Sequence, residues 1–305
     1  MTGIRPRIVV GLDGSPESMT AARWAAHEAT LRDLPLHLLH TFVIPTVGMI
    51  GYTVPTALTD GLYATGERIL AEATTELRAA QPDLEVTGRL VQADPRPALV
   101  EASTDAALTV VGTRGGGRIP EVILGSVALH VTAHGRSPVA VIPVGTDVAG
   151  LAATQAQPSA GGPVRLGVDG SRISEAAVEF AFDEADRRRA PLQAVIVWDD
   201  ADLRGLVAAG TPLDLVEDDK EHALLAEQLA GWRDKYPDVV VEQVVRRGRA
   251  AEALLRAEPD GPDPQMIVVG SRGRGGFTGL LLGSTSHSLV GHSRWPVVVV
   301  RSSAR

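Results

Sequence analysis

The sequence predicts an α/β fold built from two tandem copies of one domain, each with a mainly parallel sheet covered by helices on both faces. Its 305 residues are about twice the common domain size. Short β-branched runs alternate with helical patterns, which is typical of parallel sheets with crossover helices. Residues 9–15, VVGLDGS, recur as RLGVDGS at 165–171, and residues 110–115, VVGTRG, recur as VVGSRG at 268–273. Two copies therefore explain both the length and the repetition.

Five strands are expected in each copy, where apolar and β-branched residues run together. They cover residues 7–12, 36–42, 84–92, 108–112 and 139–144, then 164–168, 192–198, 239–246, 266–270 and 297–301. Amphipathic helical spacing is clearest at residues 17–32, 66–80 and 217–235. In such a sheet, ligands are expected beyond the carboxyl ends of the strands.

The segment at residues 146–162 is rich in Ala, Gly, Thr, Gln and Ser and has no periodicity. This composition predicts a flexible linker. We therefore expect a first domain at residues 1–145 and a second at residues 163–305, and the motifs described next recur in both.

The composition excludes several classes of function. The chain has no cysteine, so disulfides, thiolate metal sites and cysteine nucleophiles are excluded. The formal charge is -8, from 29 basic and 37 acidic residues, and argues against a nucleic-acid partner. No window approaches the roughly 20 apolar residues of a membrane span, and the N-terminus does not have the pattern of a signal peptide. We expect a cytoplasmic protein without membrane insertion.

A glycine-rich segment follows the fourth expected strand of each copy. Gly112, Gly115 and Gly125-Ser126 have the same spacing as Gly270, Gly273 and Gly283-Ser284. The spacing predicts a strand end, a close backbone approach to a ligand, and a helix N-terminus that binds phosphate. The alternative is that these glycines only shape a turn. Neither a P-loop motif nor a G-x-G-x-x-G after the first strand of either copy is present.

Charged residues accompany these glycines. Asp13 and Asp169 follow the first strand of each copy and could bind a ribose or a base, or hold Mg²⁺ near phosphates. The alternative for both is an Asx-turn or a helix cap. Arg114 and Arg272 could neutralise phosphate or remain solvated loop residues. His130 and His134 have a spacing compatible with a metal ligand pair, but packing or capping explains them better.

These motifs, with Asp13 and Asp169, resemble those of ATP-binding universal stress proteins, most of all the tandem-domain members of actinobacteria. The resemblance covers both copies. It implies two Rossmann-like domains, each with a five-stranded parallel sheet in the order 3-2-1-4-5 and ATP at its carboxyl edge. It also implies up to two ATP per chain and pairing of the domains through the last strand. That pairing would be a pseudo-dimer within one chain, with a homodimer as a further possibility. We further expect Mg²⁺ with the ATP and an unidentified regulatory protein partner.

Carried over by position, the resemblance assigns a set of nucleotide contacts. In the first copy they are Gly11, Asp13, Ser15, Thr41, Gly112, Arg114, Gly115, Gly125, Ser126 and Val127. In the second copy they are Gly167, Asp169, Ser171, Val197, Gly248, Gly270, Arg272, Gly273, Gly283, Ser284 and Thr285. No metal ligands beyond the two aspartates are assigned.

The first copy departs from the family pattern after its third strand. It has Ala93-Asp94-Pro95 where the second copy has Gly248 at a typical glycine position. This difference predicts weaker nucleotide binding in the first copy, because Ala93 and Pro95 restrict the backbone and Asp94 adds a negative charge. Residues 45–61 and 199–219 also differ, and could give partner specificity or form a lid.

The predicted function is that of an ATP-dependent regulator or sensor in stress or growth arrest. No motif supplies an evident general base or nucleophile with its partner, so we assign no catalytic residue. Two alternatives stay open. One is a slow Mg²⁺-dependent ATP hydrolase, and the other is a protein-interaction module that holds no nucleotide.

Overall fold

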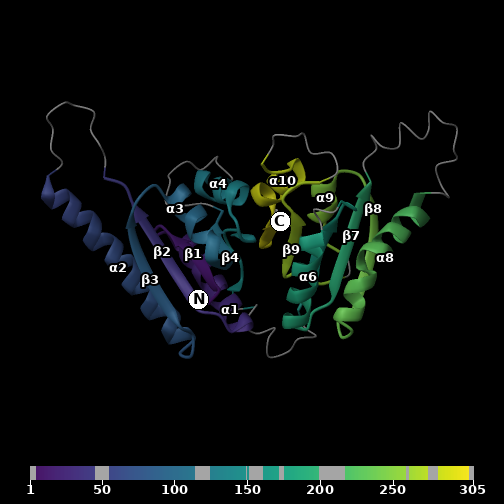
Figure 1. The fold of residues 1–305 in the computed structure, drawn as a ribbon, viewed down its shortest axis with the longest axis horizontal. Helices are drawn as coiled ribbons and strands as arrows, with labels where there is room; N and C mark the ends of the chain where they lie inside the picture. The colour runs from purple at the N-terminus through teal and green to yellow at the C-terminus, as the bar shows by residue number, and fades with distance from the viewer. Residues whose placement is uncertain are drawn as a thin grey trace. The chain divides into compact units, whose positions relative to one another are not determined.

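The computed structural model describes residues 5–44, 55–113, 124–148, 150, 161–171, 175–198, 217–258, 261–273 and 281–301. The chain divides into two compact units, Met1–Val148 and Ala149–Arg305 (Figure 1). Of the expected linker at 146–162, residues 149 and 151–160 lie outside the described residues. Each unit has a parallel sheet with helices, which confirms the predicted α/β class.

The first unit contains five parallel strands in the spatial order β3-β2-β1-β4-β5. Helices α1 and α2 contact one another, and so do α3 and α4. Right-handed crossovers place these two pairs on opposite faces of the sheet. In chain order the elements are β1 (Arg7–Leu12), α1 (Pro16–Arg32), β2 (Leu36–Phe42), α2 (Thr56–Ala80), β3 (Val86–Gln92), α3 (Pro95–Ala102), β4 (Ala106–Gly112), α4 (Ser126–His134) and β5 (Val139–Ile142).

The second unit repeats this arrangement in the order β10-β9-β6-β7-β8. Helix α6 contacts α8, and α9 contacts α10. Its elements are β6 (Val164–Val168), α6 (Glu175–Arg188), β7 (Leu192–Trp198), α8 (Glu217–Lys235), β8 (Val241–Arg247), α9 (Ala250–Leu254), β9 (Met266–Gly270), α10 (Ser284–His292) and β10 (Val297–Val300).

Helix α3 begins where the sequence suggested a restricted loop. Asp94 is its N-cap, and the Asp94 carboxylate accepts a hydrogen bond from the Arg96 N–H. Pro95 occupies the first helical position, where its fixed φ is favourable and its missing N–H costs nothing. Pro95 therefore starts a helix.

The central strands are buried, as parallel strands covered on both faces must be. In β1, Ile8, Val9 and Val10 are fully buried, and all four residues of β5 are buried. The core of each unit therefore lies along its sheet, and the carboxyl ends of the strands are left to form loops.

In the second unit a charged residue lies among the apolar residues of the sheet. Arg165 is fully buried, at the position that Val9 occupies in the first unit. Its Nε donates to Gln193 Oε1 at 2.7 Å. Its Nη1 donates to the carbonyls of Leu254, the last residue of α9, at 2.9 Å and of Arg256 at 2.7 Å. Its Nη2 pairs with Glu258 at 3.3 Å. These partners satisfy the buried guanidinium and tie the end of α9 to the sheet.

Candidate functional site

Asp13 and Asp169 form the same turn after β1 and β6. Asp13 Oδ1 accepts hydrogen bonds from the Ser15 N–H at 3.0 Å and from Ser15 Oγ at 2.6 Å. Asp169 Oδ1 accepts the same two bonds from Ser171, at 2.9 and 2.7 Å. The Asx-turn expected as the alternative is therefore present in both units. In each aspartate, Oδ1 accepts both bonds and stabilises the turn. These bonds also fix the orientation of the second carboxylate oxygen, Oδ2.

Ser15 also caps helix α1. Its hydroxyl oxygen accepts a hydrogen bond from the Ser18 N–H at 3.1 Å, and Pro16 follows at the start of the helix. Ser15 thus has a complete local explanation as a cap, independent of any ligand.

The glycine-rich segments bring each strand end to the start of the next helix. After β4, the Gly125 N–H donates to the Thr113 carbonyl at 2.7 Å, and after β9 the Gly283 N–H donates to the Ser271 carbonyl at 2.8 Å. The Thr113 and Ser271 N–H groups in turn donate to β5 and β10, at 3.0 and 2.8 Å. The same main-chain connection is therefore built twice. Arg114 and Gly115 lie outside the described residues.

Gly125 and Gly283 are the N-caps of α4 and α10. Their φ values are -69° and -70°, so neither position needs glycine for its conformation. Within the part of the chain that the structure describes, no side chain caps either helix. The first N–H groups of a helix have no acceptor within it, and the helix dipole adds positive charge there. Each helix start can therefore bind an anion. Ser126, Val127, Ser284 and Thr285 occupy the first positions of these helices.

Gly273 brings the glycine-rich segment of the second unit against the aspartate. A Cβ atom at Gly273 would lie 2.6 Å from Asp169 Oδ2, closer than real contacts allow. Only glycine fits here without displacing the carboxylate. The two motifs, far apart in the chain, therefore meet at one edge of the sheet, beside Gly270 at the end of β9.

Gly11 and Gly167 have a packing explanation. A Cβ at Gly11 would lie 3.0 Å from Leu99 of α3, and one at Gly167 would lie 2.9 Å from Leu254 of α9. These glycines let a helix lie close to the first strand of each sheet. Thr41 and Val197 are the penultimate residues of β2 and β7. They lie at the carboxyl edge of the sheet, as does Gly112 at the end of β4.

Gly248 and Ala93 give the two units different backbones after the third strand. Gly248 has a φ of 118°, a value that residues with a side chain rarely adopt. Ala93 is not among the described residues with a positive φ. The charge of Asp94 is balanced locally, because Arg96 Nη2 lies 2.6 Å from Asp94 Oδ2. The hydrogen bonds from Arg96 lower the pKa of Asp94 to about 2.

His130 and His134 stack on helix α4 with ring centroids 4.1 Å apart and an angle of 21° between the rings. Partial burial lowers the pKa of the His130 imidazole, and the charges of His134 and Arg96 lower it further. The described residues contain no group of three or more His, Cys, Asp and Glu that could hold a metal ion. Stacking explains this pair.

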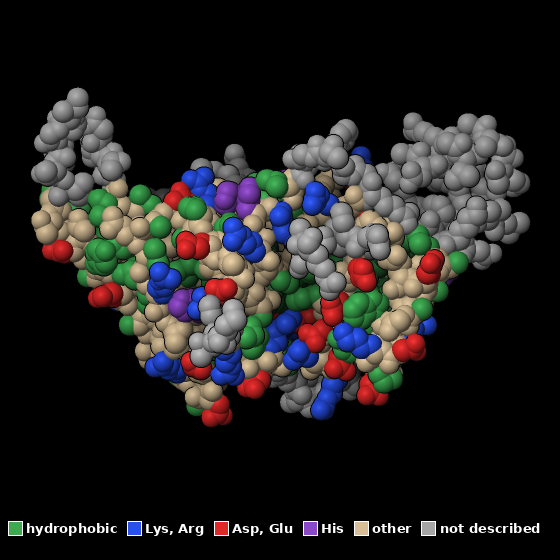
Figure 2. Space-filling model, viewed as in Figure 1, with side chains coloured by type: hydrophobic (Ala, Val, Ile, Leu, Met, Phe, Trp, Pro, Cys, Tyr) green, Lys and Arg blue, Asp and Glu red, His purple; other side chains and the backbone are tan. Residues whose placement is uncertain are grey.

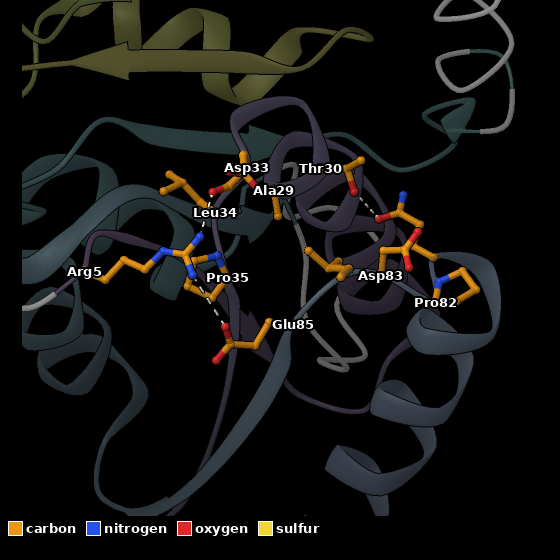
Figure 3. A pocket seen from close by; sticks show the side chains of 11 residues that line it. Arg5, Ala29, Thr30, Asp33, Leu34, Pro35, Pro82, Asp83 and Glu85 are labelled. Carbon is orange, nitrogen blue, oxygen red and sulfur yellow. Dashed lines mark hydrogen bonds and ion pairs between the residues drawn. The ribbon is translucent and has the colours of Figure 1, made fainter.

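A cavity of about 430 Å³ in the first unit lies away from these motifs. It is lined by the turn between α1 and β2, including Asp33 and Pro35, and by residues 81–85 before β3 (Figure 3). Arg5 points across it toward Glu85, with 3.8 Å between the charged atoms. These segments precede their strands, so the cavity is at the edge of the sheet opposite the candidate site.

Known proteins of one family are similar to nearly the whole chain. The family model for the universal stress protein family matches residues 5–143 and 163–301. Universal stress protein Rv2623 of Mycobacterium tuberculosis (strain ATCC 25618 / H37Rv) is 36% identical over 301 residues, covering 97% of this chain and 96% of that protein. Universal stress protein Rv2005c of the same strain is 39% identical, covering 97% of both chains.

Among solved structures, a universal stress protein from Archaeoglobus fulgidus DSM 4304 matches with a TM-score of 0.68. It is 21% identical and the match covers 97% of this chain and 98% of that chain, so the likeness concerns the fold. No helix among the described residues is long and apolar enough to cross a membrane. On the face drawn in Figure 2, basic and acidic side chains are interspersed.

Proposed function

The chain belongs to the universal stress protein family, and on this premise we propose that it binds ATP and acts as a nucleotide-dependent regulator or sensor in stress or growth arrest. One observation carries the proposal: an uncapped helix start is hydrogen-bonded to a strand end in both units, by Gly125 to Thr113 and by Gly283 to Ser271. This geometry suits phosphate, and its repetition suits two nucleotides per chain.

The chemistry of the site supports a nucleotide more than a simple anion. N–H groups at the start of α4 or α10 would hold phosphate, with the hydroxyl of Ser126 or Ser284 as a further donor. Each charge-assisted hydrogen bond contributes about 1.5–3 kcal/mol. Asp13 or Asp169, held by its turn, would accept a bond from a ribose hydroxyl.

Mg²⁺ is part of the proposal. Mg²⁺ is commonly bound by one or two carboxylates together with substrate phosphates. A single aspartate in each unit, Asp13 or Asp169, fits that donor set when a nucleotide supplies the remaining oxygen atoms. The ion would neutralise phosphate charge at the site.

The regulatory part of the proposal requires a protein partner whose binding depends on whether ATP is present. We include in it the pairing of domains through their last strands, within one chain or between two chains. The cytoplasmic location stays a prediction. The proposal assigns no catalytic residue, and slow hydrolysis of ATP is an outcome that the test below can reveal.

The first test is to purify the full-length protein without added nucleotide, denature it, and identify and count the small molecules released. About two ATP per chain is the result expected from two helix-start sites of equal strength. About one per chain would support weaker binding in the first domain. No released nucleotide, followed by no ATP binding in a titration, would overturn the proposal in favour of a nucleotide-free interaction module.

A pair of variants at Gly283 tests the helix start itself. A Cβ here would lie 3.4 Å from Arg272 Cα and from the Ser271 carbonyl oxygen, which is ordinary contact, so Gly283→Ala should keep binding. The branched side chain of Gly283→Val needs further space beside the helix start, and we expect it to abolish ATP binding in the second domain. Unfolding midpoints of both variants control for the fold. Equal ATP affinity in the two variants would contradict the assignment, and phosphate release measured alongside would detect hydrolysis.

A further inference from the structure

One face of the sheet carries different side chains in the two units. In the first unit it is the face on which Gly11 lies against Leu99 of α3, and alternate residues of β1, β2 and β3 share it. The charged or titratable side chains of these three strands on that face are Arg7, His37 and Arg89. All three are basic.

Arg7 and Arg89 lie on either side of His37. The register pairs His37 with Val9 of β1 and with Thr87 of β3. Arg7 comes two residues before Val9, and Arg89 two residues after Thr87. Each arginine is therefore a diagonal neighbour of the histidine, at about 8 Å between Cα atoms from the strand spacing and the rise of two residues. Burial lowers the pKa of the His37 imidazole, and the charges of Arg7 and Arg89 lower it further, which agrees with this placement.

Helix α3 covers only part of this face. It starts directly after β3 and has eight residues, so it is about 12 Å long, against about 23 Å for the seven-residue strand β2. Its contact with Gly11 lies near the carboxyl end of β1. Thr87 and Arg89 are exposed, and Arg7 and His37 are half-buried. A solute can therefore reach the three basic side chains.

The cluster has hydrogen-bond donors left for a ligand. Arg7 Nε is shielded from solvent and has no hydrogen-bond partner among the described residues. A buried donor without an acceptor is costly, so an acceptor supplied by a ligand would be stabilising. His37 Nδ1 lies 2.9 Å from Thr87 Oγ1, and the Thr87 hydroxyl donates to the Leu36 carbonyl at 3.4 Å. We infer that Nδ1–H donates to Thr87, so that Nε2 becomes a further donor when the ring is protonated.

Two other arginines near this face are already paired with carboxylates. Arg5, which precedes β1, lies 3.8 Å from Glu85. Arg96 of α3 lies 2.6 Å from Asp94. Each of these pairs is neutral in sum, so neither adds to nor cancels the charge of the cluster.

The remaining acidic residues of α3 and of the turn after it are Glu101 and Asp105, and both are exposed. Within the described part of the chain, neither forms an ion pair with Arg7 or Arg89. Arg136 adds a positive charge beside the same turn, because its Nη1 donates to a side chain of the turn at 3.2 Å. The two guanidinium groups of the cluster are therefore not paired with a carboxylate.

The second unit closes the matched face with its own side chains. Pro163 and Val244 stand at the positions of Arg7 and Arg89, and Gln193 at that of His37. Hydrogen bonds, direct or through Gln193, join two basic and two acidic side chains there, which are Arg165, Arg246, Glu242 and Glu258. That network is neutral in sum and needs no ligand.

We propose that Arg7, His37 and Arg89 form a binding site for a phosphate group on the first domain, separate from the nucleotide site at the carboxyl edge of the sheet. Two guanidinium groups and a protonated imidazole match the charge of a phosphate dianion better than that of a single carboxylate. The ligand is inorganic phosphate or a small phosphomonoester. This inference does not depend on the proposed function, because none of the three residues is among the assigned nucleotide contacts.

The test follows the His37 imidazole by NMR in the full chain, with His37→Gln to assign its resonance. A dianion beside the ring favours the protonated form, so replacing sodium chloride by sodium phosphate at equal ionic strength should raise the pKa of His37. Phenyl phosphate is then used in the same way. An equal rise would identify phosphomonoesters as ligands, and a rise with inorganic phosphate alone would assign the site to free phosphate.

Arg89→Gln separates charge repulsion from ligand binding, and Arg89 is exposed, so the fold should tolerate the change. Without phosphate, the variant should raise the pKa of His37, because a repelling charge is lost. Its affinity for phosphate should fall about tenfold, as expected for one charge-assisted contact, and so should that of Arg7→Gln. Arg89→Lys should keep most of the affinity. Arg68→Gln is the matched control, since Arg68 pairs with Glu72 on α2, the helix of the opposite face.

Three outcomes would overturn the site. A response of His37 to phosphate no larger than its response to sodium chloride would show screening alone. Equal losses of phosphate affinity in Arg89→Gln and Arg68→Gln would show that the cluster is not the ligand's position. Loss of the response in Gly125→Val would place the phosphate at the nucleotide site instead, whereas a response that persists in this variant supports a separate site.

Discussion

Three of the matched positions at which the two domains differ lie in the sheet or directly after a strand. Inside the sheet Val9 is matched by Arg165, after the third strand Ala93 is matched by Gly248, and after the fifth strand Pro143 is matched by Arg301. The hydrogen bonds from Gly125 to Thr113 and from Gly283 to Ser271 are nevertheless alike. The comparison teaches that the main-chain connection from the fourth strand to the next helix is retained between the copies, while the backbone after the third strand and several supporting side chains have diverged.

The largest expected effect is on the buried network that only the second domain contains. Arg165→Met should lower the free energy of unfolding of the second domain by about 3 kcal/mol, because it leaves Gln193 Oε1 and two carbonyl groups without the donor that Arg165 supplies. We take the low end of the usual range because the Glu258 side chain is 30% exposed and keeps its ion pair with Arg246. Hydrogen exchange resolved by domain would measure the loss.

Arg249→Met is the matched control for that variant. Its pair with Glu252 has side chains 81% and 70% exposed, so the change in the free energy of unfolding should stay below about 0.5 kcal/mol. Similar losses in Arg165→Met and Arg249→Met would show that the buried network contributes nothing special to the second domain.

The next effect is on the loop after the third strand. Gly248→Ala should destabilise the second domain by about 1–3 kcal/mol, because a φ of 118° strains any residue with a Cβ. No atom of the described residues lies within 4 Å of that Cβ, so the effect should come from the backbone. Chemical denaturation followed by domain-resolved hydrogen exchange would measure it.

The reciprocal variant in the first domain sharpens the comparison. Ala93→Gly should cost only about 0.5–1 kcal/mol, through the greater entropy of the unfolded chain. If Gly248→Ala lowered the free energy of unfolding by no more than Ala93→Gly, the backbone difference between the two loops would not contribute to stability.

The smallest effect is a pH dependence of the first domain. Burial and nearby Arg7 and Arg89 lower the pKa of His37 below its ordinary value of 6.5, and the pKa of His130 is also lowered. The unfolded chain therefore takes up these protons first as the pH falls. Between about pH 7.5 and about pH 5.5, the free energy of unfolding of the first domain should decrease.

The second domain supplies the control for this pH dependence. Gln193 and Ser288 stand at the matched positions and do not titrate. A His37→Gln, His130→Ser double variant should therefore make the first domain less sensitive to acid, as measured by hydrogen exchange at both pH values. Unchanged sensitivity in the double variant would assign the effect to other groups.

Much of the fold could be predicted because the strands are continuous apolar runs. Strands β1, β2, β6, β7 and β9 and helix α8 have the predicted bounds. The predicted bounds were less accurate where a strand meets a polar loop. Strand β3 begins at Val86, two residues later than expected. Helix α2 begins at Thr56, well before the expected residue 66, and there Tyr63 packs edge-on against Phe42 at 4.6 Å. That contact comes from the tertiary structure and leaves no local pattern.

Helix α3 was missed although its start has a local signal. An aspartate followed by proline is typical of an N-cap and a first helical residue, and Asp94-Pro95 has that pattern. The two prolines, Pro95 and Pro97, obscured it. The predicted charge effect of Asp94 also left out Arg96, which follows two residues later and pairs with it.

The candidate site was predictable as a set of motifs and not as a set of contacts. Equal glycine spacing in both copies indicated where the helix starts lie. The approach of Gly273 to Asp169 depends on how distant segments meet, and so does the packing of Gly11 against Leu99. The match of Arg301 with Pro143 required the register of the last strands, which pairs Val300 with Gly270 and Ile142 with Gly112.

The main-chain bonds of Gly125 and Gly283 also decide which genetic experiment can find this site. An alanine scan removes side chains and leaves N–H groups and carbonyls where they are, so alanine at Gly125 or Gly283 would be nearly silent, and alanine at Ser126 or Ser284 would remove only one of several donors. A library that adds bulk, with valine or larger residues in place of glycine, would reveal the same positions as intolerant. A copy of this domain would lose nucleotide binding when a larger side chain occupies the space of the phosphate. In the sequence, that loss would be visible as a bulky residue in place of a glycine.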